Sequence, residues 1–216
     1  MRLANILLLT LLPTLNLFAQ DEAPMRTLLG NAHDLHHGGW GAPTTDYTRI
    51  MDQDALLVGG RGGWLIDHRV TIGLAGQGLT TNITNAAYDD QRHLAGDDTP
   101  GTSRFFMGYG GLLIEPIIAY RSPVHLSLPL IIGAGGCGYE NSGALPHDFD
   151  PHNYREDAKA FFVVEPGIDL EVNLIPLVRL GLGASYRYTS DIDLPGTASD
   201  ALHGFNAGVR VKIGRF

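Results

Sequence analysis

Apolar residues alternate with polar or small ones along most of this chain, with a period of two residues. The stretch Ala160–Asn173 shows the pattern most clearly: one alternate set is apolar throughout, whereas the other carries Glu165, Asp169 and Glu171. Successive side chains of a β-strand point to opposite faces of the sheet, so this period indicates a strand with one apolar and one acidic face. A chain built from such segments is expected to fold as a sheet.

The same alternation recurs in six more segments and, less cleanly, in an eighth at Thr44–Met51. The six are Ala55–Ile66, Arg69–Thr80, Phe105–Tyr120, Val124–Gly136, Leu177–Thr189 and Gly204–Phe216. Short connections alternate with long polar ones at 82–103, 140–159 and 191–200, so an up-and-down sheet would place the long loops at one end. Because eight strands suffice to close a sheet, we predict an all-β fold, a closed antiparallel up-and-down β-barrel over residues 44–216.

Three prolines fall within the predicted strands: Pro116, Pro129 and Pro166. Proline has no N–H to donate to a strand ladder. We therefore expect bulges or early strand ends at these positions.

The alternation alone fits two kinds of barrel. A secreted soluble barrel, acting as a binding protein, would turn the apolar set inward, whereas a membrane barrel would turn it toward lipid. The aromatic residues Trp64, Phe162 and Tyr188 lie near segment ends on the apolar set, as in the aromatic girdles of membrane barrels. The polar set carries both signs of charge, which suits a shared interior. We therefore expect a transmembrane barrel whose lumen holds a charge network of Arg61, Glu115, Glu165, Asp169, Glu171, Arg179, Arg187, Arg210 and Lys212.

The N-terminus has the pattern of a secretory signal peptide over residues 1–20. Arg2 precedes an apolar run that extends to Phe18, and this run contains Pro13 and is short for a membrane-spanning helix. Residues 21–43 are then expected as a periplasmic segment that precedes the barrel.

The net charge and the cysteine content exclude some classes of partner and site. The formal net charge is −8 at pH 7, so nucleic acid is not expected as a partner. The single cysteine, Cys137, has no partner for an intrachain disulfide or a thiolate metal site.

A signal peptide, eight alternating Gly-rich segments, long loops on one side and the C-terminal Phe216 together resemble small outer-membrane β-barrels of the OmpA/OmpX type. The resemblance covers residues 44–216 and implies an outer-membrane location, outer-membrane lipids as the surroundings, and a terminal aromatic residue read by the barrel assembly machinery. Here Ile213, Val211 and Val209 are one step out of phase with Phe216, and a bulge at Gly214 would reconcile them.

Eight strands leave a lumen that side chains fill, so a wide pore is not expected. The function predicted is structural or surface-interacting; the alternatives are a lipid-modifying enzyme and a narrow channel. His125, Ser127 and Glu115 are the residues that a nucleophile–base set would use, but we assign no catalytic residue.

Two polar segments carry residues that could bind a metal ion. His33, His36 and His37 lie beside Asp34, and Asp and His residues recur in Leu145–Asp157. The first stretch is part of a polar, Gly-rich N-terminal segment and the second has no EF-hand spacing, so both are interpreted as solvated, and no metal or cofactor is expected. An extracellular ligand would bind through the loops at 82–103, 140–159 and 191–200.

Overall fold

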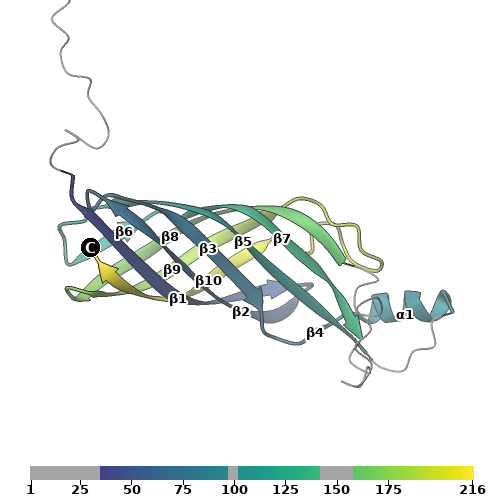
Figure 1. The fold of residues 1–216 in the computed structure, drawn as a ribbon. Helices are drawn as coiled ribbons and strands as arrows, with labels where there is room; N and C mark the ends of the chain where they lie inside the picture. The colour runs from purple at the N-terminus through teal and green to yellow at the C-terminus, as the bar shows by residue number, and fades with distance from the viewer. Residues whose placement is uncertain (1–34, 97–101, 142–157) are drawn as a thin grey trace, which may run out of the picture.

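A ring of tilted antiparallel strands forms the body of the protein (Figure 1). The computed structural model describes residues 35–96, 102–141 and 158–216. The strands are β1 His37–Ile50, β2 Gln53–Ile66, β3 Val70–Leu79, β4 Ile83–Thr84, β5 Ser103–Ile118, β6 Val124–Ser127, β7 Leu130–Asn141, β8 Ala158–Ile175, β9 Val178–Thr189 and β10 Gly204–Arg215. Since β4 is a short side strand and β6 with β7 forms one wall position, the ring has eight positions.

The ring closes where the first strand meets the last. β1 pairs with β10 in one unbroken register from Gly39↔Arg215 to Thr48↔Asn206. Around the rest of the ring, each wall position pairs with the wall positions before and after it along the chain. The predicted closed, antiparallel, up-and-down barrel is therefore confirmed.

The first strand begins at His37 rather than at Thr44. Its outward positions include Gly41, Pro43 and Thr45, which carry no large apolar side chain. The alternation is therefore faint in this strand, and part of the segment expected to precede the barrel belongs to the wall.

The prolines affect the wall less than expected. Leu128 and Pro129 separate β6 from β7, but β5 and β8 continue through Pro116 and Pro166. The pairings on both sides of Pro129 keep the same register, so no bulge forms there. A backbone hydrogen bond of 2.8 Å from Gly167 N to Pro129 O bridges the break.

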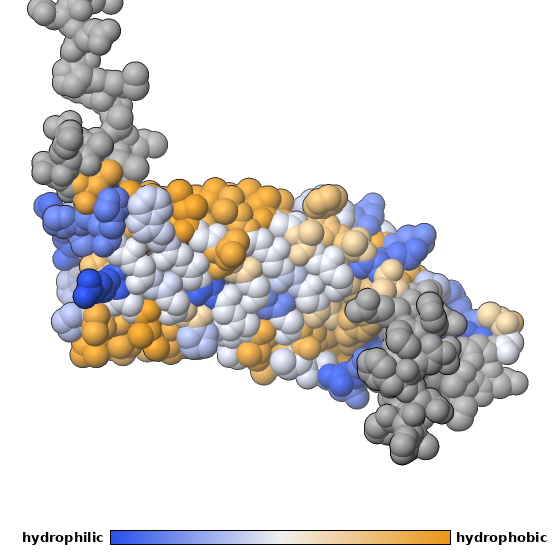
Figure 2. All heavy atoms as spheres, in the orientation of Figure 1, coloured by the Kyte–Doolittle hydropathy of each residue, from blue (hydrophilic) through white to orange (hydrophobic). Residues whose placement is uncertain are grey.

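Side chains face the way that a membrane barrel requires. Leu74 is 70% exposed and Leu182 57%, whereas Glu115 and Asp169 are fully buried inside the ring. Apolar residues accordingly form broad areas on the barrel side, interrupted by a pale surface of intermediate hydropathy (Figure 2). A soluble barrel would show the opposite arrangement.

A helix that the alternation does not predict lies at the long-loop end. α1, Ala86–Leu94, begins after Asn85, whose side-chain oxygen accepts a hydrogen bond of 3.1 Å from Ala87 N. Tyr88 of this helix stacks on Tyr139 of β7, with 3.8 Å between ring centroids. Within the described ranges, no helix has the length and apolar character needed to cross a bilayer.

Leu170→Arg tests the outward face. Leu170 of β8 is 45% exposed beside Leu126 and Leu182, so an arginine there would meet lipid and is expected to destabilise the folded barrel by about 2–4 kcal/mol if it lies near the midplane. Urea unfolding in lipid vesicles measures the change. Leu94→Arg, at an 88% exposed position of α1 outside the ring, is the control and should have little effect. Equal tolerance of both arginines would mean that the barrel wall does not face lipid.

Candidate functional site

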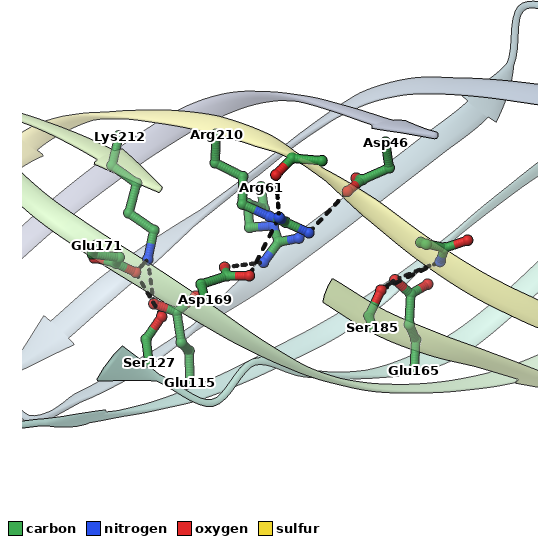
Figure 3. A network of polar contacts seen from close by, with 12 residues as sticks. Asp46, Arg61, Glu115, Ser127, Glu165, Asp169, Glu171, Ser185, Arg210 and Lys212 are labelled. Atoms are coloured by element: carbon green, nitrogen blue, oxygen red, sulfur yellow. Dashed lines mark hydrogen bonds and ion pairs between the residues drawn. The ribbon is translucent and has the colours of Figure 1, made fainter. Parts of the chain in front are cut away.

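The lumen is filled by charged side chains, and one group of them surrounds Lys212. The ammonium of Lys212 forms ion pairs with both Glu115 and Glu171 (Figure 3). Glu171 also accepts a hydrogen bond of 2.6 Å from Ser127 Oγ, and its second oxygen lies 3.2 Å from His125 Nε2. Four wall positions, in β5, β6, β8 and β10, thus meet at one buried cation.

A second group joins two arginines to two aspartates. Arg210 Nη2 lies 2.9 Å from Asp46 Oδ1, and Arg210 Nη1 lies 3.3 Å from Asp169 Oδ1. Arg61 Nη1 binds the other oxygen of Asp169 at 3.2 Å. Asp46 was missed in the sequence because β1 lacks a clear alternation, although the inward set from Ala42 to Ile50 contains it.

Glu165 and Arg187, both members of the expected charge network, form no direct ion pair with each other. Glu165 instead accepts hydrogen bonds from Tyr109, from Ser185 Oγ at 2.6 Å and from Asn206 Nδ2 at 3.1 Å. Arg187 Nη1 donates to Asn206 Oδ1 at 3.2 Å. The Asn206 amide therefore lies between the two charges, donating to the carboxylate and accepting from the guanidinium.

The buried charges balance. Of the described residues that are buried, five are aspartate or glutamate (Asp46, Glu115, Glu165, Asp169 and Glu171) and five are arginine or lysine (Arg61, Arg179, Arg187, Arg210 and Lys212). Arg179 completes the set at 3.9 Å from Glu171, with its guanidinium over the Phe216 ring. A buried charge is tolerated only when it is paired and hydrogen-bonded, so equal numbers of each sign favour burial of the network.

Apolar side chains occupy both sides of the charge network. Toward the short turns, Trp40, Leu65, Leu113 and Ile117 form one cluster, and the Lys212 ammonium lies 4.1 Å from the centre of the Trp40 ring. At the long-loop end a larger cluster contains Leu57, Phe105, Met107, Tyr139, Phe161, Ile192, Leu194 and Leu202. The last three come from the connection between β9 and β10, which folds inward over the barrel end.

The residues considered for catalysis serve the network. Ser127 and His125 both contact Glu171, and they are 0% and 2% exposed. A nucleophile must reach its substrate, whereas the Ser127 hydroxyl is fully buried and donates to a buried carboxylate. Oxygens of Glu115, Asp169 and Glu171 lie within 4.8 Å of one another, but Lys212 already supplies a cation to two of these groups.

Phe216 packs against the cluster at the short turns and is only partly exposed. The pairing of β10 with β1 continues without a shift through Trp40↔Gly214 and Gly39↔Arg215, so the expected bulge at Gly214 is absent. A side chain at Gly214 would overlap Gly39 O and Trp40, which explains the glycine. Recognition of Phe216 by the assembly machinery stays a prediction.

The other candidate segments are partly described. The signal peptide, His33, Asp34 and Leu145–Asp157 lie outside the described residues. His36 and His37 lie at the short-turn end, where their rings contact His68 and Trp64. At the other end, Asp89 accepts a hydrogen bond of 3.1 Å from Ser103 N and thereby joins α1 to β5.

A closed ring of eight strand positions, apolar outside and charged inside, defines the small transmembrane β-barrel as the fold class. Neisserial surface protein A (NspA) has this fold, with a TM-score of 0.56 and 9% sequence identity over 83% of this chain and 97% of that one. Ail of Yersinia pestis, in complex with the heparin analogue sucrose octasulfate, has a TM-score of 0.47 and 9% sequence identity over 83% of this chain and 98% of that one. The N-terminal β-barrel domain of Pseudomonas aeruginosa OprF has a TM-score of 0.43 and 11% sequence identity over 81% of this chain and 96% of that one. No family model and no curated protein matches the sequence.

Lys212→Met tests the buried ion pairs. Removing the ammonium leaves Glu115 and Glu171 without the cation that binds both, so the free energy of unfolding in vesicles should fall by about 3–5 kcal/mol. Arg49→Gln is the control, because Arg49 is exposed and lies 3.8–3.9 Å from Asp52 and Asp54, and it should cost less than about 1 kcal/mol. Similar losses in both variants would show that burial of the Lys212 pairs is not what makes them important.

Two glycines of β9 provide a sharper test of packing in the network. A side chain at Gly183 would overlap Asp169 Oδ1 and Arg210 Nη1, whereas one at Gly181 would meet its nearest atoms at 3.7 Å, an ordinary contact. Gly183→Ala should therefore destabilise the barrel by about 1–3 kcal/mol, because the buried ion pair must move to admit the methyl group. Gly181→Ala should be much less destabilising in the same urea titration. The reverse order would contradict the described geometry of Arg210 and Asp169.

Proposed function

We propose that this protein is a structural or surface-interacting barrel of the outer membrane and that it does not form a diffusion pore. The observation that carries the proposal is the filled lumen, in which five acidic and five basic buried side chains are held between two apolar clusters. Signal-peptide removal and insertion by the assembly machinery complete the proposal, supported by the sequence of residues 1–20 and by Phe216.

The cavity found among the described lumen residues is too small for solutes. A cavity of about 10 Å³ lies beside Thr44, Arg61, Gln77 and Tyr109, which is room for about one water molecule. An ion that crossed the barrel would also have to pass the apolar cluster at the long-loop end, where burial without partners is costly. These features support a closed lumen.

The long-loop end supports the surface-interaction role. A hollow of about 700 Å³ lies there, bordered by Arg49, Asn85, Thr197, His203 and Phe205. This volume is within the range of small-ligand sites, about 300–1,000 Å³. The Asn85 amide donates to Gly196 O at 2.9 Å, and that bond fixes one wall of the hollow before any ligand arrives. Binding through loops at 82–103, 140–159 and 191–200 is therefore part of the proposal.

Residence in the membrane is tested by cell fractionation and by gel migration with and without heating. A folded barrel should enter the outer-membrane fraction and should migrate differently after heating, because heat opens the closed ring. Recovery as a detergent-independent monomer in the soluble fraction would contradict this location.

Electrical recording tests the closed lumen. We expect the refolded protein in planar bilayers to give no steady conductance, since both the ion pairs and the apolar clusters obstruct the lumen. A bilayer containing a large porin is the positive control for the apparatus. Steady current at the level of that porin, from protein that gel migration shows to be folded, would overturn the proposal.

A further inference from the structure

Three segments meet at the rim that carries the short turns. The N-terminal side of β1 binds the β2–β3 turn through a hydrogen bond of 2.8 Å from Asp67 N to His36 O. The same turn binds β5 through a hydrogen bond of 2.6 Å from Ile117 N to Arg69 O. The β5–β6 turn follows directly after β5 and contains Tyr120 and Arg121. These backbone hydrogen bonds thus fix the relative positions of the three segments and of the side chains that they carry.

Tyr120 lies at the centre of a group of basic side chains, which we call the Tyr120 cluster: His36, His68, Arg69, Tyr120 and Arg121. The guanidinium carbons of Arg69 and Arg121 lie 5.4 and 5.5 Å from the centre of the Tyr120 ring. The His68 ring stacks on that of Tyr120 at 6.0 Å with an angle of 7°, and the His36 ring contacts His68 edge-on at 5.5 Å. Two guanidiniums and two imidazoles are therefore concentrated around one phenol.

Positive charge exceeds negative charge in this cluster. Asp67 pairs with Arg69 at 3.3 Å, but within the described part of the chain Arg121 forms no ion pair with a carboxylate. The Arg69 guanidinium beside Tyr120 lowers the pKa of the Tyr120 hydroxyl. The Arg69 side chain is 47% exposed and Arg121 is exposed, so both remain accessible to an anion.

An apolar surface adjoins the cluster on the outside of the barrel. Trp64 is 52% exposed, and Ile72 and Ile118 are 45% and 50% exposed. Trp64 pairs with Ile72 across β2 and β3, and the Trp64 ring contacts His37 at 5.3 Å. Aromatic side chains of this kind mark the boundary between hydrocarbon and headgroups in membrane barrels. The Tyr120 cluster therefore lies at headgroup level, next to a surface suited to acyl chains.

We propose that the Tyr120 cluster binds the headgroup phosphate of an anionic glycerophospholipid. Arginine guanidiniums match the oxygens of a phosphate, and an adjoining aromatic and aliphatic surface accommodates the acyl chains. Short turns of such barrels lie on the periplasmic side, so the lipid belongs to the inner leaflet of the outer membrane. This inference rests on the proposed membrane location, and it adds one lipid class and one site to it.

Trp64 is a built-in probe for the bound lipid. The sequence has two tryptophans, and Trp40 is buried in the lumen at 6% exposure, where it donates a hydrogen bond of 3.0 Å to Thr71. Bromine atoms on acyl chains quench tryptophan on contact, so they report lipid at Trp64 against a constant background from Trp40. The measurement is made with the refolded barrel in phosphatidylcholine vesicles that contain brominated phosphatidylglycerol or, separately, brominated phosphatidylcholine.

We expect phosphatidylglycerol to be preferred at Trp64 by about fivefold, the gain that one basic residue near a charged membrane surface provides. Arg69→Gln with Arg121→Gln should reduce the preference to about onefold, and 1 M salt should reduce it in the wild type through screening, which is strong at about that concentration. Arg49→Gln, an exposed arginine at the opposite rim, is the matched control and should keep the preference.

Three results would overturn the inference: equal quenching by both lipids in folded wild-type protein, an unchanged preference in the double variant, or the same loss in Arg49→Gln. Gel migration establishes that each variant is folded. Absence of quenching by either brominated lipid would instead show that the barrel does not contact the bilayer, and the proposed membrane function would fail together with the site.

Discussion

Charge pairing inside a narrow ring is the interaction on which the rest of this structure depends. An eight-position barrel has little room for water, so every inward carboxylate and ammonium must find its partner among the other strands. Lys212 illustrates the requirement, since it joins carboxylates from β5 and β8, and Arg210 does the same for β1 and β8. Each pair fixes the relative height of two strands, because a slip of one residue would turn the charge toward lipid.

The neutral hydrogen-bonding residues are as necessary as the ions. Glu165 has no basic partner within ion-pair distance among the described residues, and it is satisfied by hydroxyl and amide donors from Tyr109, Ser185 and Asn206. Asn206 also accepts from Arg187, which lets one amide connect two charges of opposite sign. Hydrogen bonds thus connect the charged groups of the network where direct ion pairs are absent.

Much of the wall could be predicted from the sequence, because membrane contact forces a period of two wherever the outward side chains are large. β8 and β10 show this clearly. The period fades in β1, whose outward Gly41, Pro43 and Thr45 carry no apolar signal, and for that reason Asp46 was missed. The strand faces also do not show which lumen side chains contact each other. The position of Asn206 between Glu165 and Arg187, for example, depends on how three strands are placed. α1 and the inward fold of Ile192 and Leu194 arise from tertiary packing at the barrel end, which a local period does not encode.

The pair Asp46–Arg210 spans the seam between the first and last strands of the ring, 164 residues apart along the chain. Neither partner is neutralised by the other until the chain is complete and the ring is shut. A barrel with an open seam would therefore leave Asp46 on one edge without Arg210, while Arg210 on the other edge would keep only Asp169 as a partner. Closure brings the two charges together in a single step, so the seam favours an all-or-none transition. The Asp46–Arg210 pair thus stabilises the closed seam. Separating β1 from β10 would break this buried ion pair, which makes opening of the ring costly in free energy.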